Sequence, residues 1–303
     1  MRYFGKDIKI FINNLVVSYT DEGSDDAPVI IFIHGFPLNK SMWNKQMEAL
    51  KDNYRVIAYD LRGHGDSDAG NEEFSIELFV SDLLSLMNVL KIDKASLCGL
   101  SLGGYIVLNA IENYPERFDA LVLSDTHCIA DPPDIKEKRM KTIESIKEYG
   151  AEKYVKDSIK SLFASESFTS KIPEIEAVRE MILNTTEQSL YKTILALYVR
   201  EETCNMLNKI KVPVLVLVGE EDKITLPEAA RFMHESIQDS TLHIIKHVGH
   251  LSNLENSDEF NDQLTKFFAK VYDEQEIIST DDNDSILKQL RHQLNILLSF
   301  KPI

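Results

Sequence analysis

The sequence has few cysteines and no pair of them at the spacing of a redox or metal-binding motif. Its three cysteines, Cys98, Cys128 and Cys204, are spread over 303 residues. None has cysteine or histidine neighbours at a useful ligand spacing. We therefore expect three free thiols, no metal ion and the reducing environment of the cytoplasm.

Long apolar runs and a basic surface are also missing. No uncharged apolar stretch approaches the roughly 18 residues of a membrane span, and residues 1–7 lack the apolar segment of a signal peptide. Lys and Arg number 33 against 49 Asp and Glu, a net charge of −16. An acidic surface repels nucleic-acid phosphates and anionic lipid head groups. The sequence predicts a cytoplasmic protein that binds neither nucleic acid nor a membrane.

One serine occupies a position that favours nucleophilic chemistry. Ser101 stands between Gly99 and Gly103, directly after the apolar run at 95–98 and before a helical pattern at 104–111. A serine at such a sharp strand-to-helix turn is exposed on a strained corner, and glycines are needed because a Cβ atom would collide with the adjoining elements. The alternative is a glycine-rich turn whose serine caps the helix.

Two later strands are expected to end beside residues that would complete a catalytic site. The apolar run at 212–218 leads to Asp222, and the run at 242–246 leads to His250. An aspartate can orient a histidine, and a histidine can activate a serine hydroxyl at neutral pH. His247 is the rival base, but it lacks the glycine that precedes His250.

These motifs make the chain resemble the α/β-hydrolase superfamily, most closely its esterase, 3-oxoadipate enol-lactonase and haloperoxidase-like (perhydrolase) branch. The order Ser, Asp, His is the one expected of this superfamily and differs from the orders of the two well-known serine protease folds. The likeness spans residues from about 28 to 270. It is carried by His-Gly-Phe-Pro at 34–37, by 59–67, by Gly-Leu-Ser-Leu-Gly-Gly at 99–104 and by Gly-His at 249–250.

The resemblance implies a catalytic triad of Ser101, His250 and Asp222. Some relatives place the acid after an earlier strand, so Asp125 is the alternative. The backbone N–H groups of Phe36 and Leu102 are implied as the oxyanion hole.

Other substrate contacts are inferred only from nearness in the sequence. The residues expected to form the apolar walls are Phe36, Leu38, Trp43, Leu102 and Leu251.

The implied function is hydrolysis of a small carboxylic ester or lactone through an acyl-enzyme intermediate, with no metal or organic cofactor. The same triad serves C–C bond hydrolases, perhydrolases and acyltransferases, which remain alternatives. A non-catalytic ligand receptor with this fold is the competing class, and fold alone does not identify a substrate.

The expected architecture is an α/β-hydrolase fold, because apolar strands alternate with helical segments. This alternation favours a mostly parallel sheet with helices on both faces. We expect the core to comprise residues 1–128 and 212–272, with a helical cap, or lid, at 129–211 above the carboxyl edge of the sheet.

The last part of the chain, 273–303, is predicted to be a linker followed by an amphipathic helix. Large aliphatic residues lie on one face of 286–298. This helix is expected to dock on its own core, to pack on a second copy in a homodimer, or to be recruited by another protein.

Overall fold

The computed structural model describes residues 5–273. The chain divides into two compact units, residues 1–263 and 264–303, and the fold and site belong to the first. Within the described residues, eight strands form one sheet in the order β1-β2-β4-β3-β5-β6-β7-β8. The strands are β1 (Gly5–Ile12), β2 (Leu15–Glu22), β3 (Val29–Ile33), β4 (Arg55–Tyr59), β5 (Ala95–Leu100), β6 (Phe118–Ser124), β7 (Val214–Gly219) and β8 (Ser240–Ile245).

The sheet is parallel apart from the pairings of β2. Strand β2 runs antiparallel to both β1 and β4, and the five pairings from β4 to β8 are parallel. Asn13 and Asn14 join β1 to β2, and both have a positive φ, as the tightest hairpin turns require. The expected mostly parallel α/β sheet is confirmed.

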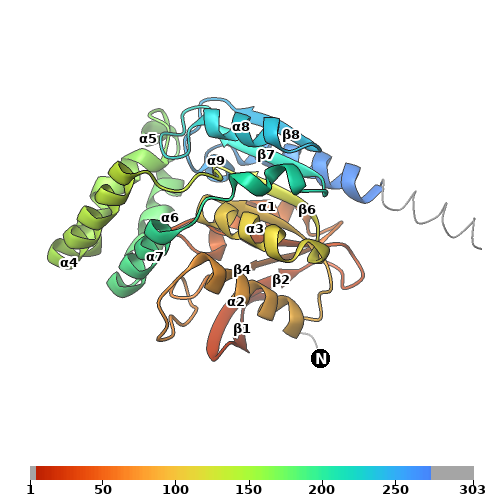
Figure 1. Cartoon of the computed structure of the whole chain (residues 1–303), viewed down its shortest axis with the longest axis horizontal. Coiled ribbons are helices and arrows are strands. Elements are labelled where there is room, and N and C mark those ends of the chain that lie inside the picture. The colour runs from red at the N-terminus through yellow and green to blue at the C-terminus, as the bar shows by residue number, and fades with distance from the viewer. Residues whose placement is uncertain (1–4, 274–303) are drawn as a thin grey trace, which may run out of the picture. The chain divides into compact units, whose positions relative to one another are not determined.

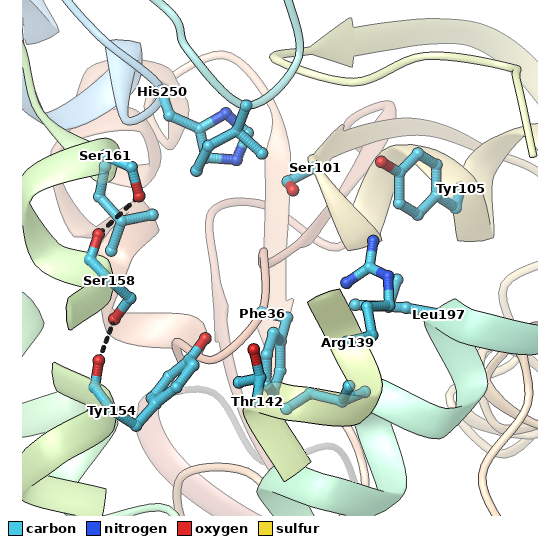
Figure 2. Close-up of a pocket in the computed structure, with 13 residues that line it drawn as sticks. Phe36, Ser101, Tyr105, Arg139, Thr142, Tyr154, Ser158, Ser161, Leu197 and His250 are labelled. Carbon is cyan, nitrogen blue, oxygen red and sulfur yellow. Dashed lines mark hydrogen bonds between the residues drawn. The ribbon is translucent and has the colours of Figure 1, made fainter. Parts of the chain in front are cut away.

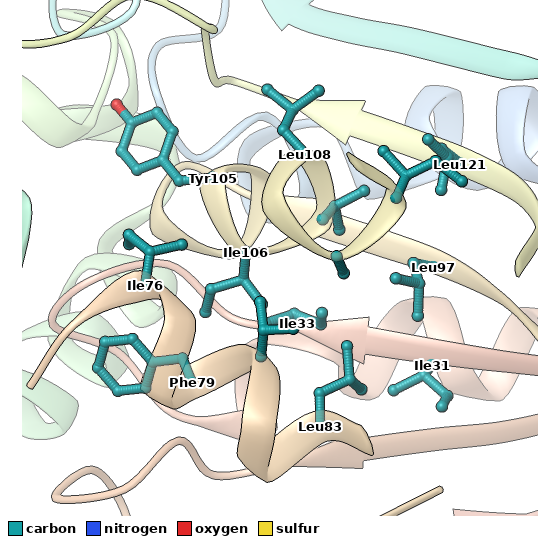
Figure 3. Close-up of a cluster of buried hydrophobic side chains, with 14 of the residues drawn as sticks. Ile31, Ile33, Ile76, Phe79, Leu83, Leu97, Tyr105, Ile106, Leu108 and Leu121 are labelled. Carbon is teal, nitrogen blue, oxygen red and sulfur yellow. The ribbon is translucent and has the colours of Figure 1, made fainter. Parts of the chain in front are cut away.

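Helices cover both faces of this sheet, since strands such as β4 and β5 are buried along their whole length. Figure 3 shows Leu83 and Ile106, from two helices, in one cluster with Ile33 of β3. Phe32, which precedes Ile33 in β3, points to the opposite face of the sheet. The centres of the Phe32 and Trp43 rings are 5.1 Å apart. The helices are α1 (Asn44–Leu50), α2 (Ile76–Val89), α3 (Leu102–Asn113), α8 (Pro227–Ser236) and α9 (Ser252–Glu255), with short 3₁₀ turns η1 (Lys40–Trp43), η2 (Pro115–Arg117) and η3 (Cys204–Lys209). Residues 257–263 are also helical, and the second unit is helical by itself over residues 264–273.

A group of helices lies between β6 and β7 in the sequence and beside the sheet in Figure 1. Helix α4 bends at Gly150, where φ is 77°. Its apolar residues pack on α7 through a cluster of Ile143, Ile146, Leu190 and Ile194. The helices of this cap are α4 (Pro133–Leu162), α5 (Ser167–Ser170), α6 (Ile172–Leu183) and α7 (Glu187–Val199).

A disulfide bond joins the two ends of the cap. It links Cys128, just after β6, to Cys204, 76 residues later at the start of η3. The expectation of three free thiols is therefore wrong for this pair, because the cap returns to its point of departure and brings the two sulfurs together. Only Cys98 among the three is free, and it is buried. Disulfides persist in oxidising compartments, so the thiol argument no longer supports a cytoplasmic location, which stays a prediction.

Two predictions about partners concern a membrane and the helix expected near the end of the chain. Within residues 5–273, every helix is too short or too polar to cross a bilayer. The amphipathic helix expected at 286–298 lies outside the described residues, and so do its three alternative roles of docking on the core, forming a homodimer or being recruited by another protein.

Candidate active site

Ser101 sits at a strained turn between β5 and α3. Its φ is 53° and its ψ −111°, a conformation that costs free energy for any residue with a side chain. A Cβ atom on Gly99 would stand 2.4 Å from the carbonyl carbon of Gly103, and one on Gly103 would stand 2.2 Å from the carbonyl oxygen of Ile33. Both glycines are therefore required for the close approach of strand and helix.

The hydrogen bonds around this turn hold Ser101 in place. Its backbone N–H donates to the carbonyl of Ser124 at 3.0 Å, and its carbonyl accepts from the Thr126 hydroxyl at 2.9 Å. The strand beside the turn thus braces the backbone of the serine, which leaves its hydroxyl in the pocket (Figure 2).

Asp222 lies in the loop after β7 and is 2% exposed. Its carboxylate accepts from the N–H groups of Ile224 and Thr225, from the Thr225 hydroxyl at 2.6 Å, and from His250 Nδ1 at 2.8 Å. Burial alone would raise the pKa of Asp222. The facing His250 and these hydrogen bonds outweigh burial and hold the pKa below its usual value. Asp222 is therefore a carboxylate already fixed in one orientation.

His250 follows β8 and is equally buried. Because Nδ1 is bonded to Asp222, Nε2 is the nitrogen left to act on another group. Burial lowers the pKa of His250, but the negative charge of Asp222 more than offsets it and raises the pKa above 6.5. The rival His247 is exposed and its backbone N–H bonds the Glu220 side chain.

Asp125, the alternative acid, is buried at the end of β6 but does not bond His250. Its carboxyl group accepts from the hydroxyls of Ser124 and Ser252 and from the N–H of Gly219 at 2.9 Å. Burial and the neighbouring charge of Asp222 raise the pKa of Asp125 to about 7. The structure thus brings Asp222, and not Asp125, to the histidine.

Ser101 and His250 face one cavity of about 190 Å³ between the sheet and the cap. The structure shows no hydrogen bond between these two side chains, and such bonds are often long in hydrolases without substrate. Figure 2 shows the serine and histidine on one side and α4 opposite them. The residues lining the cavity are Phe36, Ser101, Tyr105, Arg139, Thr142, Tyr154, Ser158, Ser161, Leu162, Ile194, Leu197, Ile224 and His250.

Four of the five residues expected in the cavity wall lie elsewhere, which corrects that part of the sequence analysis. Phe36 lines the cavity, whereas Leu38, Trp43, Leu102 and Leu251 are at most 1% exposed and do not line it. Trp43 packs between Phe32 and Phe260 on the sheet. Nearness in sequence misled here, because these side chains point into the core while the cap supplies most of the apolar wall.

The two residues expected to form an oxyanion hole flank the serine turn. Leu102 is the first residue of α3, so its N–H has no partner within the helix and lies at the positive end of the helix dipole. Phe36 follows β3 and lines the cavity. Their role in binding an oxyanion stays a prediction.

His34 and Arg62, in the loops beside the site, have structural partners. His34 Nε2 accepts from the N–H of Leu61 at 3.0 Å, and burial lowers the His34 pKa to about 4. Arg62 donates twice to Asp82, at 2.6 and 2.7 Å. These contacts hold the loops in place and leave neither side chain free to transfer protons.

The sequence provided no indication of two residues that help to position the histidine, Thr225 through its hydroxyl and Glu255 through its carboxylate. The Thr225 hydroxyl donates to the Asp222 carboxylate at 2.6 Å and lies 3.3 Å from His250 Nδ1, so it contacts both members of the pair. Glu255 accepts from the N–H of Gly249 at 2.8 Å and from the N–H of Ala164 at 2.8 Å, which ties the histidine loop to the cap. Their residue types alone carried no signal, because threonine and glutamate at such spacings are common on surfaces.

The part of the chain that the structure describes contains no group of three or more His, Cys, Asp or Glu side chains placed to hold a metal ion. What it contains is a mostly parallel sheet, a strained serine after β5, and an Asp–His pair after β7 and β8. This combination defines an α/β-hydrolase fold.

Comparison with known proteins agrees. The family model described as the alpha/beta hydrolase fold matches residues 28–257, and the chain belongs to this family. It is 28% identical over 248 residues to 3-oxoadipate enol-lactonase 2 of Acinetobacter baylyi, and the aligned part covers 82% of this chain and 91% of that protein. It is 30% identical over 230 residues to a bifunctional esterase/perhydrolase of Acinetobacter calcoaceticus, and the aligned part covers 69% of this chain and 79% of that protein.

Solved structures show the same likeness. A thermophilic esterase from Thermogutta terrifontis, solved with malate bound, superimposes with a TM-score of 0.82 at 31% identity, covering 87% of this chain and 98% of that one. The resemblance to the esterase, enol-lactonase and perhydrolase branch is confirmed, and the chain is a hydrolase of this fold.

Proposed function

We propose that this hydrolase cleaves small carboxylic esters or lactones through an acyl-enzyme intermediate. The observation that carries the proposal is the buried 2.8 Å hydrogen bond between Asp222 and His250, in the same cavity as the strained Ser101. The esterase and enol-lactonase among the similar proteins support it.

In the first half of the reaction, the Ser101 oxygen attacks the carbonyl carbon while His250 Nε2 takes the hydroxyl proton. The resulting oxyanion would accept hydrogen bonds from the N–H groups of Leu102 and Phe36, each worth about 3 kcal/mol of barrier in other enzymes. The tetrahedral intermediate then expels the alkoxide, which His250 protonates. In a lactone, the alkoxide stays attached to the acyl group.

In the second half, water replaces the alcohol. His250 takes a proton from water as the oxygen adds to the acyl carbon, and collapse returns the electron pair to the Ser101 oxygen, which regains its proton. Asp222 keeps the histidine in the tautomer with hydrogen on Nδ1 and stabilises the imidazolium in both halves.

The same groups would serve C–C bond hydrolysis, acyl transfer and perhydrolysis, which differ in the bond broken or in the acceptor. A panel of esters and lactones, assayed with and without hydrogen peroxide or an acceptor alcohol, separates these reactions.

The test of the proposal is labelling by a fluorophosphonate followed by ester kinetics. We expect the wild type to be labelled on Ser101 and to cleave short p-nitrophenyl esters. Ser101→Ala should abolish labelling and lower kcat by at least about 10³-fold while remaining folded. His250→Ala should behave similarly, and His247→Ala should match the wild type because that side chain is exposed. An unlabelled wild-type protein would point instead to a non-catalytic receptor.

A further inference from the structure

The disulfide bond at the base of the cap lies next to the active site. Cys128 belongs to the segment 125–132, which leads from β6 into α4, and Cys204 begins η3 after the cap has ended with α7. The chain therefore enters and leaves the cap through two segments that one covalent bond joins. We call these two segments, 125–132 and 200–204, the cap junction.

The residues just before Cys128 contact the active-site cavity. The Thr126 hydroxyl donates to the carbonyl of Ser101 at 2.9 Å and so braces the strained turn. His127 Nε2 lies 3.2 Å from the hydroxyl of Tyr105, and Tyr105 lines the cavity as Ser101 does (Figure 2). A displacement of Cys128 is therefore passed through the adjoining backbone to the serine turn and to the cavity wall.

The residues after Cys128 connect the two arms of the cap. Asp131 accepts hydrogen bonds from Arg139 Nε on α4 and from Arg200 Nη2, at 3.0 Å, at the end of α7. Arg200 Nη1 also donates to the carbonyl of Ile129 at 2.6 Å. Because α4 and α7 both carry residues of the cavity wall, the shape of the cavity depends on how firmly this junction is held.

The cap junction keeps its hydrogen bonds when the disulfide is broken. The Thr203 N–H donates to the carbonyl of Cys128 at 2.9 Å, and this bond and those of Arg200 do not involve either sulfur. Hydrogen bonds exchange with water at little net cost, whereas a covalent bond fixes the separation of its two ends. Reduction would therefore leave the fold in place and loosen the junction.

The two sulfurs differ in their access to a reductant. Cys128 is 1% exposed, whereas Cys204 is only partly buried, and thiol–disulfide exchange depends on which sulfur an attacking thiolate can reach. A thiolate of a dithiol attacks Cys204 Sγ, the disulfide breaks, and its electron pair passes to Cys128 Sγ, which takes up a proton. The second thiol of the reagent then attacks the reagent's own sulfur in the mixed disulfide and releases Cys204 as a thiol. The dithiol becomes a cyclic disulfide, so two electrons and two protons pass to the protein.

We propose that the bond between Cys128 and Cys204 is a reversible redox control of the active site, with the oxidised protein as the more active form. Reduction loosens the segment that braces Ser101 and joins the arms of the cap. Disulfides of cytosolic proteins are usually transient or redox-sensing, so the predicted cytoplasmic location is one in which the bond would open and close. The effect on catalysis rests on the proposed function, whereas the loosening of the junction does not.

The experiment equilibrates the protein with mixtures of reduced and oxidised dithiothreitol and then measures hydrolysis of a p-nitrophenyl ester. Alkylation and mass spectrometry give the fraction of protein that carries the disulfide in each mixture. We expect kcat/KM to fall by about 5- to 150-fold from the oxidised to the reduced protein, the usual range for coupling between two sites. The fall should follow the fraction of disulfide and should reverse on reoxidation.

Thermal melting distinguishes control from unfolding. All assays are run well below the melting temperature of the oxidised protein, and circular dichroism of the reduced protein is recorded at the assay temperature. The reduced protein should retain the spectrum of the oxidised one. A reduced protein that is already unfolded at that temperature would overturn the proposal, because its loss of activity would be a loss of structure.

Two cysteine variants serve as matched controls. Cys128→Ala combined with Cys204→Ala should show the low activity of the reduced protein in every mixture. Cys98→Ala should respond to dithiothreitol as the wild type does, because Cys98 is buried in β5 and takes no part in the disulfide. A double variant as active as the oxidised wild type, or one that still responds to the reductant, would show that this bond does not control the site.

Hydrogen exchange measured by mass spectrometry separates the junction from catalysis. Reduction should raise the exchange rate of backbone N–H groups in the cap junction by about tenfold or more, with little change in β4. If no ester is hydrolysed in either state but exchange in the junction responds, the proposed function fails and the redox loosening stands. Exchange that does not respond overturns the inference. So does an ester hydrolase whose kcat/KM is the same in both states.

Discussion

Replacing Asp222 by asparagine tests which carboxyl group orients the histidine. The substitution keeps the size of the side chain, and its amide oxygen can still accept from the N–H groups of Ile224 and Thr225, which lie 2.8 and 3.0 Å from Oδ1. The change falls on Oδ2, which lies 2.8 Å from His250 Nδ1. An amide nitrogen at that place donates where the carboxylate accepted.

The expected loss follows from the tautomer of the histidine. An asparagine NH₂ facing Nδ1 stabilises the form with hydrogen on Nε2, and that form cannot accept the proton of Ser101. In other triad enzymes this exchange lowers kcat by about 10⁴-fold, or about 5.5 kcal/mol of barrier. We expect Asp222→Asn to lose about 10³- to 10⁴-fold in kcat while its melting temperature stays near that of the wild type.

Asp125→Asn is the matched control, because Asp125 is equally buried and ends the neighbouring strand. Its Gly219 contact can be kept by the amide oxygen, and the Ser124 and Ser252 hydroxyls can reverse to accept from the amide. We expect less than about tenfold loss in kcat. Both variants are assayed with one p-nitrophenyl ester at saturating substrate. A crippled Asp125→Asn beside a nearly normal Asp222→Asn would show that our choice of acid is wrong.

Two further predictions concern pH and the disulfide. Because His250 must be neutral to accept a proton and Asp222 raises its pKa, kcat/KM should rise with pH through one ionisation above 6.5; an inflection below 6.5 in the pH profile would contradict this reading. Reduction, or Cys128→Ser combined with Cys204→Ser, should destabilise the fold by about 2–5 kcal/mol, since the bond closes a loop of 76 residues. Thermal melting with and without reductant measures the loss, and alkylation of all three cysteines in the unfolded, unreduced protein would disprove the bond.

Much of the fold and the reactive centre could be read from local patterns. Apolar runs without alternation predict strands buried on both faces, and glycines on either side of Ser101 predict a turn too tight for side chains. The carboxyl ends of parallel strands meet at one edge of a sheet. Residues that follow such strands, among them Asp222 and His250, could therefore be expected to come together.

Patterns of this kind did not distinguish between neighbours at that edge. Asp125 and Asp222 follow adjacent strands, β6 and β7, and both are buried. Which of them reaches His250 depends on loop conformation: the short loop of Asp222 turns its carboxylate toward the histidine, whereas Asp125 is held by Ser124 and Ser252.

The sequence by itself thus determined the class of fold, the strained serine and the edge of the sheet where the site forms, because each depends on residues close together in the chain. Tertiary structure alone decided the contacts between distant segments. The bond between Cys128 and Cys204 joins the two ends of the cap, and the cavity wall comes from the cap and its Arg139 instead of from Trp43. Such contacts depend on how segments far apart along the chain, 76 residues in the case of the disulfide, pack together, and no local periodicity encodes that.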